Sequence, residues 1–348
     1  MRPKRCTTFY RLATALLALA AQAAQAAVGV AEVPGREGDG PVTVFYPTAA
    51  QATTLKRGPF ALQLAENGAP ARGNGRLVIV SHGSGGSPWV HADLARTLVE
   101  AGFVVAAPEH AGDNYKDHGN FGPASWKRRP QEVSRAIDAV AADARFKPLL
   151  GVDRVGMYGM SAGGHTALSL AGGRWSPALL REHCERNLEV DFQGCVGLAS
   201  QLTGGVFDPV KKTISRWMIR SRLQDAQWYA HTDPRIAAVI AGVPFAVDFD
   251  VLSLSNPKVP LGLVTARQDK WLQPRFHSEP VLKVCAKCER VADFASGGHG
   301  ALLSPAPLGL TGLVGDLLND PPGFDRAAEV PEVNRRIAAF FGRHLPRP

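Results

Sequence analysis

A serine near the middle of the sequence carries the clearest chemical signal. The segment Gly159-Met160-Ser161-Ala162-Gly163 matches the pattern GxSxG and lies between a strand-like run at 155–160 and a helical run at 162–171. In this context the serine stands on a sharp strand-to-helix turn, where small neighbours leave its hydroxyl accessible. The pattern predicts that Ser161 is the nucleophile of an acyl-transfer reaction. The alternative is a glycine-rich turn that carries a surface serine.

Backbone N–H groups that could stabilise negative charge follow an earlier strand. The segment His82-Gly83-Ser84-Gly85-Gly86 comes directly after the apolar run at 77–81. A loop in this place can bring one N–H group beside the nucleophile, and the helix after Ser161 supplies a second N–H group and a positive partial charge. We expect the N–H groups of Ser84 and Ala162 to form an oxyanion hole, with the His82 ring hydrogen-bonded inside its own turn.

Acidic and basic partners for Ser161 follow two later strands. Asp269 comes directly after the apolar run at 261–266, and His299 stands between glycines after the run at 290–294. Loops at the carboxyl ends of neighbouring parallel strands meet at one edge of a sheet, so both side chains can reach the serine. We expect His299 to transfer protons and Asp269 to orient it. Asp248, which follows its strand at a greater distance, is the alternative acid.

Acidic residues and histidines also crowd the loop at 109–118, a composition that could indicate a metal site. Polar loops are common at the functional edge of such sheets, and acyl transfer by serine, histidine and aspartate needs no metal. The sequence therefore predicts no metal site and no cofactor.

Strands and helices alternate through most of the chain, which predicts an α/β fold with a mostly parallel central sheet and helices on both faces. Extended runs at 28–33 and 42–47 are expected to pair as edge strands before a Gly- and Ala-rich connection. A helix is expected over 130–144, with Pro130 in its first turn. Residues 172–234 lack strand-like runs, so we expect a helical cap inserted into a single domain over 27–348.

The first 26 residues have the three-part layout of a secretory signal peptide: basic residues, a short apolar run and a small-residue tract. The 348-residue chain carries 39 Lys and Arg against 31 Asp and Glu, and the leader accounts for half of this excess of +8. The remaining charge is modest, and no zinc-finger spacing or basic run with aromatics accompanies it. We expect an exported protein, periplasmic or secreted, that does not bind nucleic acid.

Four cysteines lie beyond the leader, namely Cys184, Cys195, Cys285 and Cys288. In an oxidising compartment they predict two local disulfides, Cys184 with Cys195 and Cys285 with Cys288. A four-cysteine zinc site and a redox-active CxxC pair are the alternatives. The first pair is too widely spaced for the usual zinc pattern, and the second pair leads into a strand rather than a helix.

Several further motifs occur in order along the chain: Val44-Phe-Tyr-Pro-Thr, Gly58-Pro-Phe-Ala-Leu, Ser81-His-Gly-Ser-Gly-Gly, Ala107-Pro-Glu-His, Gly159-Met-Ser-Ala-Gly-Gly and Asp233-Pro-Arg-Ile-Ala-Ala-Val. Over about residues 41–299 the chain resembles the α/β-hydrolase superfamily. Within it, the chain resembles the bacterial group described as predicted dienelactone hydrolases, which is similar to the platelet-activating factor acetylhydrolases. Two features depart from these relatives. Dienelactone hydrolase proper has a cysteine nucleophile in place of Ser161, and the acetylhydrolases take their acid nearer Asp248 than Asp269.

The residues and the resemblance together imply an exported serine hydrolase that cleaves carboxylic esters through an acyl-enzyme intermediate. The substrate would be a small-molecule or lipid ester. A phospholipid sn-2 deacylase of the acetylhydrolase type is the alternative, and a non-catalytic binding module on the same fold is the alternative of another class. The sequence predicts no particular oligomeric state.

One segment of the expected cap is both apolar and basic. Val210, Ile214, Trp217 and Met218 recur at helical spacing, and the same segment holds Lys211, Lys212, Arg216, Arg220 and Arg222. Two interpretations follow. The helix could touch an anionic lipid surface as a peripheral contact, or it could be an ordinary cap helix that packs on the sheet and keeps a solvated basic face.

Overall fold

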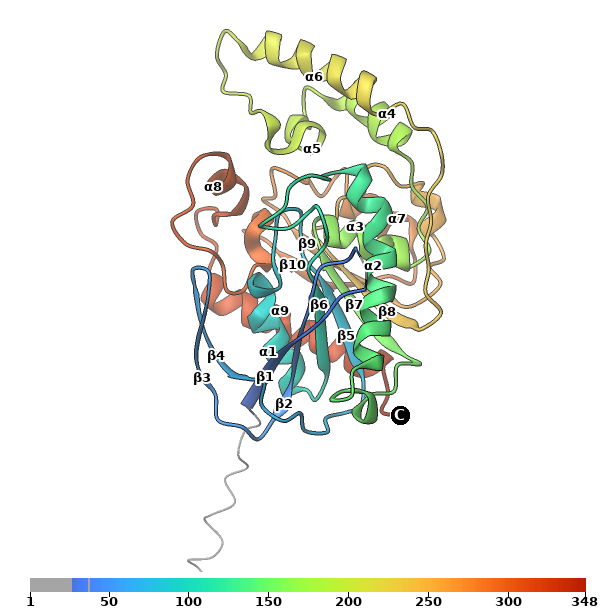
Figure 1. The fold of residues 1–348 in the computed structure, drawn as a ribbon. Coiled ribbons are helices and arrows are strands. Elements are labelled where there is room, and N and C mark those ends of the chain that lie inside the picture. The colour runs from blue at the N-terminus through green and yellow to red at the C-terminus, as the bar shows by residue number, and fades with distance from the viewer. Residues whose placement is uncertain (1–26, 37) are drawn as a thin grey trace, which may run out of the picture.

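The computed structural model describes residues 27–36 and 38–348, so the expected leader, residues 1–26, lies outside the described residues. Ten strands form one sheet in the order β10-β9-β8-β7-β5-β6-β2-β1-β4-β3 (Figure 1). Their bounds are β1 Ala27–Val33, β2 Val42–Thr48, β3 Thr53–Arg57, β4 Phe60–Glu66, β5 Leu77–Ser81, β6 Val104–Pro108, β7 Val155–Met160, β8 Ile236–Gly242, β9 Leu261–Ala266 and β10 Glu289–Phe294.

The six neighbouring strands from β10 to β6 run parallel. Strands β5, β6, β7 and β9 are buried along their whole length, as expected for apolar runs with helices on both faces. The predicted α/β fold with a mostly parallel sheet is confirmed. The carboxyl ends of these strands lead into the loops that carry the candidate site residues.

The sequence predicts that β1 and β2 form the edge of the sheet, but both strands lie inside it. β1 and β2 pair antiparallel, but β2 also pairs with β6, and β1 also pairs with β4. The edge strand is β3, which forms a hairpin with β4 across Gly58, a residue at φ +55°. β3 is largely exposed and therefore lacks the apolar pattern that marks a buried strand.

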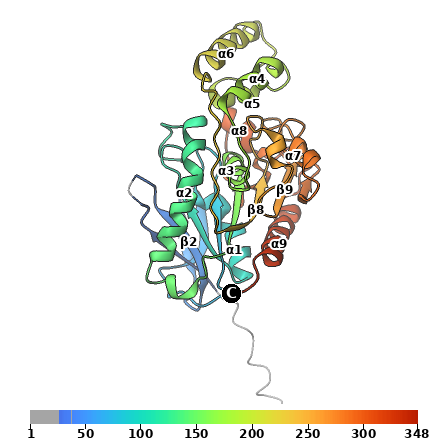
Figure 2. The same ribbon diagram turned by 90° about the vertical axis from the view of Figure 1, so that its right-hand side faces the viewer.

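Helices cover both faces of the sheet (Figure 2). One face is covered by α2 (Pro123–Ala142), α3 (Ala162–Leu170) and α7 (Ser278–Val284), and the other by α1 (Ala92–Glu100) and α9 (Arg326–His344). The expected start of α2 at Pro130 is wrong. Pro123 takes the first-turn position, where a missing N–H costs nothing, and Pro130 lies inside the helix.

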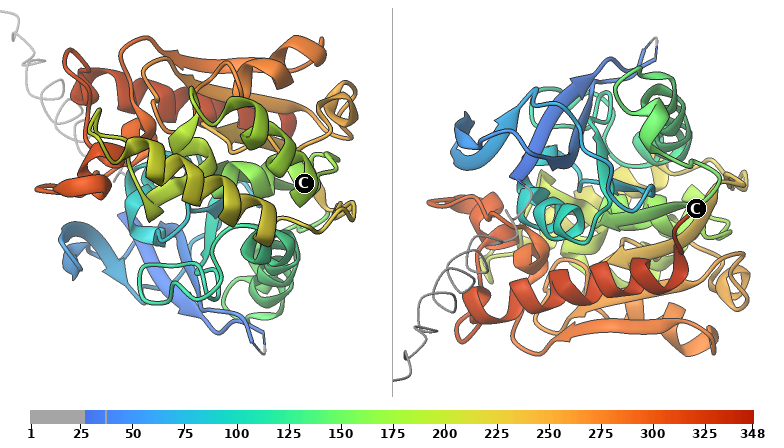
Figure 3. Two further views of the ribbon diagram at one scale, coloured as in Figure 1. Left: turned by 90° about the horizontal axis from the view of Figure 1, so that it is seen from above. Right: turned by 90° about the horizontal axis from the view of Figure 1, so that it is seen from below.

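Three helices occupy the segment between α3 and β8: α4 (Pro177–Asn187), α5 (Phe192–Val196) and α6 (Asp208–Arg222). They stand beyond the strand ends, at the top of Figure 1, and the view from above places α6 over the middle of the molecule (Figure 3). One disulfide, Cys184–Cys195, joins α4 to α5, and the other, Cys285–Cys288, closes the turn after α7. Among the described residues, no helix is long and apolar enough to cross a membrane.

Candidate active site

Ser161 stands at the turn between β7 and α3. Its backbone has φ 57° and ψ −116°, outside the regions that a residue with a side chain usually adopts. Two hydrogen bonds help to hold this conformation, because the Ser161 N–H donates to the carbonyl of Gly242 and the Ser161 carbonyl accepts from the N–H of Phe245. The turn also requires glycine beside the serine, since a Cβ on Gly163 would lie 2.0 Å from the carbonyl oxygen of Ser81.

His299 connects Ser161 to Asp269. Its Nε2 lies 3.1 Å from Ser161 Oγ, and its Nδ1 lies 2.7 Å from Asp269 Oδ2. His299 begins a short 3-10 helix that follows β10, and Asp269 follows β9, so two adjacent parallel strands deliver the pair to the same edge. A carboxylate only accepts hydrogen bonds, so Nδ1 carries the ring proton and Nε2 is free to accept the serine hydroxyl.

The groups around Asp269 favour its ionised form. Its Oδ1 accepts the N–H groups of Trp271 at 2.9 Å and Leu272 at 2.8 Å. Burial opposes ionisation, but the charge and hydrogen bond of His299, together with the two N–H groups, lower the pKa of Asp269 below its ordinary value. A carboxylate in this state can hold the imidazole in one orientation and stabilise its protonated form.

Asp248, the alternative acid, lies away from this chain of hydrogen bonds. Its Oδ2 is 3.0 Å from Nε2 of His165, and both side chains are fully buried. His165 lies about one turn into α3, where the aromatic rings of Trp126, Trp175, Phe249 and, farther away, Phe245 surround it. The structure therefore brings Asp269, and not Asp248, to His299.

Residues 82–86, here called the oxyanion loop, pass beside Ser161. A Cβ on Gly83 would lie 3.3 Å from Ser161 Cβ. Within residues 27–36 and 38–348, no group accepts a hydrogen bond from the Ser84 N–H. The Ala162 N–H is the first of α3, where helical N–H groups have no partner in their own helix. Both N–H groups predicted for the oxyanion hole are thus available near the serine.

The His82 ring is hydrogen-bonded within the core of this loop. Its Nδ1 donates to the Gly83 carbonyl at 2.7 Å, and its Nε2 accepts the N–H of His110 at 3.3 Å. Burial, and then the nearby His110 and Arg129, lower the pKa of His82 well below 6.5, so the ring is neutral around pH 7. Among the described residues, both hydrogen bonds of the His82 ring go to backbone groups and none goes to His299, so the ring supports the geometry of the turn.

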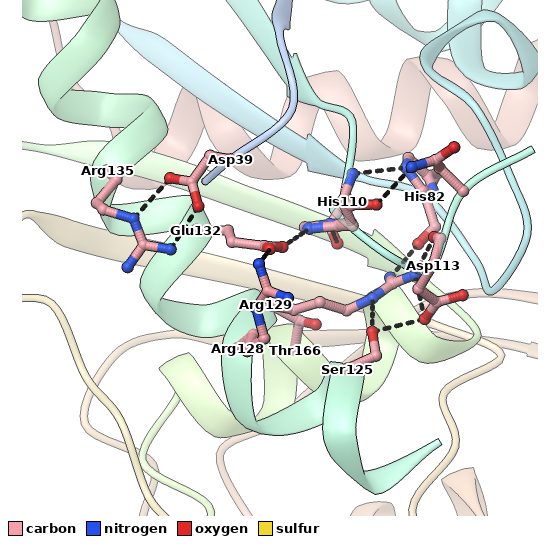
Figure 4. Close-up of polar contacts among 12 residues, drawn as sticks. Asp39, His82, His110, Asp113, Ser125, Arg128, Arg129, Glu132, Arg135 and Thr166 are labelled. Carbon is pink, nitrogen blue, oxygen red and sulfur yellow. Dashed lines mark hydrogen bonds and ion pairs between the residues drawn. The ribbon is translucent and has the colours of Figure 1, made fainter. Parts of the chain in front are cut away.

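A buried polar network behind the oxyanion loop was missed by the sequence reasoning (Figure 4). One part is the ion pair of Arg129 and Asp113, and another joins Ser81, His110 and Glu132. The second part has the same order of groups as Ser161, His299 and Asp269, with Ser81 Oγ 2.7 Å from His110 Nε2. However, Ser81 is fully buried, so a substrate has no access to it. Burial lowers the pKa of His110 and raises that of Glu132, which favours their uncharged forms.

A signal for the network was present in the sequence of α2. The apolar residues Trp126, Val133, Ile137 and Val140 on the buried face of this helix are spaced by seven, four and three residues, which corresponds to one helical stripe. Arg129 falls on the same stripe. A charged side chain on the apolar stripe of a helix is rarely buried without a partner, so Arg129 could have been assigned to a buried ion pair.

Among the described residues, one group of side chains could hold a metal ion, namely His183, Asp191 and Cys195. These side chains already have partners, because the Cys195 sulfur is bonded to Cys184 and Asp191 Oδ2 lies 2.7 Å from His183 Nε2. The acidic residues and histidines at 109–118 do not form one cluster either, since His110 and Asp113 take part in separate buried contacts.

No protein-family model matches the sequence, and no curated protein matches it either. Among solved structures, the ferulic acid esterase from Streptomyces cinnamoneus is similar, with a TM-score of 0.58 and 18% sequence identity over 94% of each chain. The chain has the α/β-hydrolase fold. At this identity the likeness concerns the fold alone. That fold places a serine turn after one central strand, and an acid and a histidine after later strands, as the loops of Ser161, Asp269 and His299 do here.

Proposed function

We propose that this protein is a serine hydrolase that cleaves carboxylic esters through an acyl-enzyme intermediate. The observation that carries the proposal is the continuous chain of hydrogen bonds from Asp269 through His299 to Ser161. Ser161 is partly exposed, whereas the other two side chains are buried, so a substrate can reach the nucleophile but not the acid. A binding module would have no use for a serine held in a strained turn against a base.

In the first half of the reaction, Ser161 Oγ attacks the carbonyl carbon of the ester while His299 Nε2 takes the hydroxyl proton. The negative charge moves to the carbonyl oxygen, where the N–H groups of Ser84 and Ala162 stabilise it. When the tetrahedral intermediate collapses, the bond to the alcohol breaks and His299 gives its proton to the departing oxygen. The acyl group stays on Ser161.

In the second half, a water molecule attacks the acyl carbon and gives a proton to His299 Nε2. The same two N–H groups stabilise the second oxyanion. The bond to Ser161 Oγ then breaks, His299 returns the proton to the serine, and the carboxylic acid leaves. Asp269 keeps its proton-free form throughout and stabilises the imidazolium formed in each half.

The comparison with solved structures supports an ester as the bond that is cleaved, but it does not identify the substrate. The similar structure is that of a ferulic acid esterase, which agrees with an ester as the substrate here. The resemblance to the dienelactone hydrolase group supports the same superfamily. Because Ser161 replaces the cysteine of dienelactone hydrolase, that resemblance does not imply lactone opening.

A series of p-nitrophenyl esters of increasing acyl length tests the proposal. We expect the wild-type protein to release p-nitrophenol and Ser161→Ala to lose on the order of 10⁶ in kcat, because the three residues act as a unit. Ser255→Ala, a change at an exposed serine, serves as the control. Turnover by Ser161→Ala at the wild-type rate would refute the proposed nucleophile.

A second candidate function is that of a phospholipid sn-2 deacylase, and the outer face of α6 favours it. On this helix Val210, Ile214 and Trp217 are between 53% and 69% exposed, whereas Ser215 and Ile219 are buried. Val206 and Phe207, directly before the helix, are 85% and 71% exposed. Of the four apolar residues predicted for the stripe, Val210, Ile214 and Trp217 are therefore exposed rather than packed on the sheet, and Met218 is partly buried. α6 itself lies at the outer end of the molecule, at the top of Figure 1.

Cations border the apolar stripe of α6. Arg222 is exposed, Arg220 is exposed and paired with Glu185, and Arg216 is partly exposed and paired with Glu189. An apolar face edged by cations is the arrangement of helices that lie in the interface of an anionic membrane. We infer a peripheral contact between α6 and a lipid surface, which would bring phospholipid esters near Ser161.

We also propose export of the protein and a cap formed by residues 172–234. Both disulfides suit an oxidising compartment such as the periplasm or the cell exterior. The proposed cap contains α4, α5 and α6 and adds no strand to the ten-stranded sheet. We therefore interpret it as an insertion into one domain over 27–348.

A further inference from the structure

The ion pair of Arg129 and Asp113 takes no part in the proposed chemistry, yet its hydrogen bonds run into the oxyanion loop. Both side chains are fully buried, and Arg129 Nη2 lies 2.8 Å from Asp113 Oδ2. Two charges removed from water are costly unless additional hydrogen bonds satisfy their remaining donors and acceptors. Several of those additional bonds go to the loop, from both Arg129 and Asp113. Figure 4 shows these two side chains beside His82, the first residue of the loop.

Arg129 holds the loop on the amino-terminal side of Ser84. Its Nη1 donates to the His82 carbonyl at 2.6 Å, and its Nη2 reaches the Gly83 carbonyl at 3.4 Å. The Gly83 carbonyl also accepts from His82 Nδ1 at 2.7 Å and from the Gly86 N–H at 3.1 Å. Three donors therefore fix the direction of this one carbonyl.

Asp113 holds the loop on the other side of Ser84. Its Oδ1 accepts the Gly85 N–H at 3.0 Å, and its Oδ2 lies 3.3 Å from the Ser84 hydroxyl. The same Oδ2 accepts the Ser125 hydroxyl at 2.6 Å, and Ser125 in turn accepts from Arg129 Nε at 2.8 Å. The carboxylate and the guanidinium are thus locked to each other and to both flanks of Ser84.

These contacts orient the peptide between Gly83 and Ser84. In a trans peptide the C=O and the N–H point in opposite directions. A Gly83 carbonyl held toward the buried donors turns the Ser84 N–H away from them. This N–H has no acceptor among the described residues, and its loop passes beside Ser161.

We propose that Arg129 and Asp113 are positioning residues that preset the oxyanion loop, so that the Ser84 N–H is already aimed when negative charge develops on the substrate. The inference rests on the proposed ester hydrolysis. Donors that are fixed in advance need no reorganisation during the reaction, and their benefit falls on the transition state. The two residues act through the loop and do not touch the substrate, so their loss should lower kcat and leave KM nearly unchanged.

The test compares Asp113→Asn with the wild-type protein. Hydrolysis of p-nitrophenyl acetate is measured per active site, with sites counted from the end point of fluorophosphonate labelling. We expect kcat per site to fall about 10²-fold, the range for loss of one oxyanion donor. KM should change by less than about threefold, and a boronic acid that forms a tetrahedral adduct on Ser161 should bind about 10²-fold more weakly, in step with kcat.

Asp233→Asn is the matched control. Asp233 is mostly buried and pairs with Arg235 at 2.7 Å, but it precedes the amino end of β8 and so lies at the opposite end of the sheet. It should lower thermal stability without lowering kcat per site or boronate affinity. A purely structural role for Asp113 would give the same result as this control.

Arg129→Lys is the variant to measure if Asp113→Asn does not fold. Lysine keeps the charge but lacks the fork that reaches the His82 carbonyl and Asp113 together, so the same loss in kcat and boronate affinity is expected. Unchanged values in a folded variant would overturn this inference alone. A wild-type protein that neither hydrolyses esters nor takes the fluorophosphonate would overturn the proposed function and this inference with it.

Discussion

Two buried aspartates lie near the serine turn, and they differ in what they hold. Asp269 bonds His299 and accepts two backbone N–H groups, whereas Asp248 bonds His165 and leaves its Oδ1 without a partner among the described residues. A catalytic acid must orient the base that contacts the nucleophile. Only Asp269 is placed for that role, and Asp248 instead ties α3 to the segment after β8.

Paired substitutions separate the two aspartates. Asp269→Asn should lower kcat by about 10⁴, because an amide at this position favours the wrong tautomer of His299. Asp248→Asn should change kcat by less than about tenfold, since it leaves the contacts of His299 intact. Initial rates on one p-nitrophenyl ester decide between them, and the reverse pattern would assign the acid to Asp248.

At the residue scale, the positions of side chains that directly follow strands could be predicted from the sequence. Parallel strands send their carboxyl ends to one edge, which is why loops more than 100 residues apart could be expected to meet at Ser161. The partners of Arg129 could not be predicted in the same way. Its contact with the His82 carbonyl spans 47 residues of sequence, and no local pattern states which loop a buried guanidinium reaches.

At the scale of helices and strands, buried elements were predictable and exposed ones were not. The runs that became β5, β7 and β9 are apolar throughout because helices cover both of their faces. The hairpin of β3 and β4 has mostly exposed positions in β3, so its Thr53–Arg57 run shows no core pattern. The start of α2 was misplaced because two prolines, Pro123 and Pro130, could each open a helix.

The outer face of α6 leads to a prediction about lipid binding. Wild-type protein should sediment with vesicles of phosphatidylglycerol but not with vesicles of phosphatidylcholine, and added salt should weaken this binding. Trp217→Ser should reduce the bound fraction at least about threefold, because Trp217 is a large apolar side chain of the stripe.

Trp228→Ser is the control for α6, because Trp228 is also exposed but lies outside that helix. It should bind vesicles as the wild-type protein does. Equal binding by Trp217→Ser and the wild-type protein, or no binding by either, would remove the lipid contact. The proposed hydrolysis of soluble esters would stand in both cases.

At the scale of the whole molecule, the helices on each face bury a separate apolar core against the sheet. The alternation of strands and helices was enough to predict this layered fold. The position of α6 was not predictable, because its apolar spacing is the same whether the stripe faces a sheet or the surroundings. Among the described residues, the cores also enclose histidine ring nitrogens without hydrogen-bond partners, and in His91 both ring nitrogens lack one.

Burial of His91 predicts a loss of stability in mild acid. Neither ring nitrogen has a partner, and burial lowers the pKa of His91 to about 4. The unfolded chain binds this proton below about pH 6.5, but the folded protein does so only below about 4. Stability therefore falls as the pH drops between these values, and His91 alone should remove on the order of 2 kcal/mol between pH 7 and pH 5.

Urea unfolding at pH 7 and pH 5 checks this expectation. The difference in the free energy of unfolding between the two pH values should be smaller in His91→Leu than in the wild-type protein. His118→Leu is the control, since His118 is exposed in the folded protein and should leave the difference unchanged. An equal pH dependence in His91→Leu and wild type would show that His91 does not couple folding to protonation.

The most direct test of the proposed function is the site of a covalent adduct. The wild-type protein is treated with a fluorophosphonate, digested and analysed by mass spectrometry, with His299→Ala treated in parallel. We predict one adduct, on Ser161, formed in step with the loss of esterase activity and strongly slowed in His299→Ala. An esterase that remains active without modification, or one that is inactivated by an adduct on another residue, would contradict the assignment of Ser161 as the nucleophile.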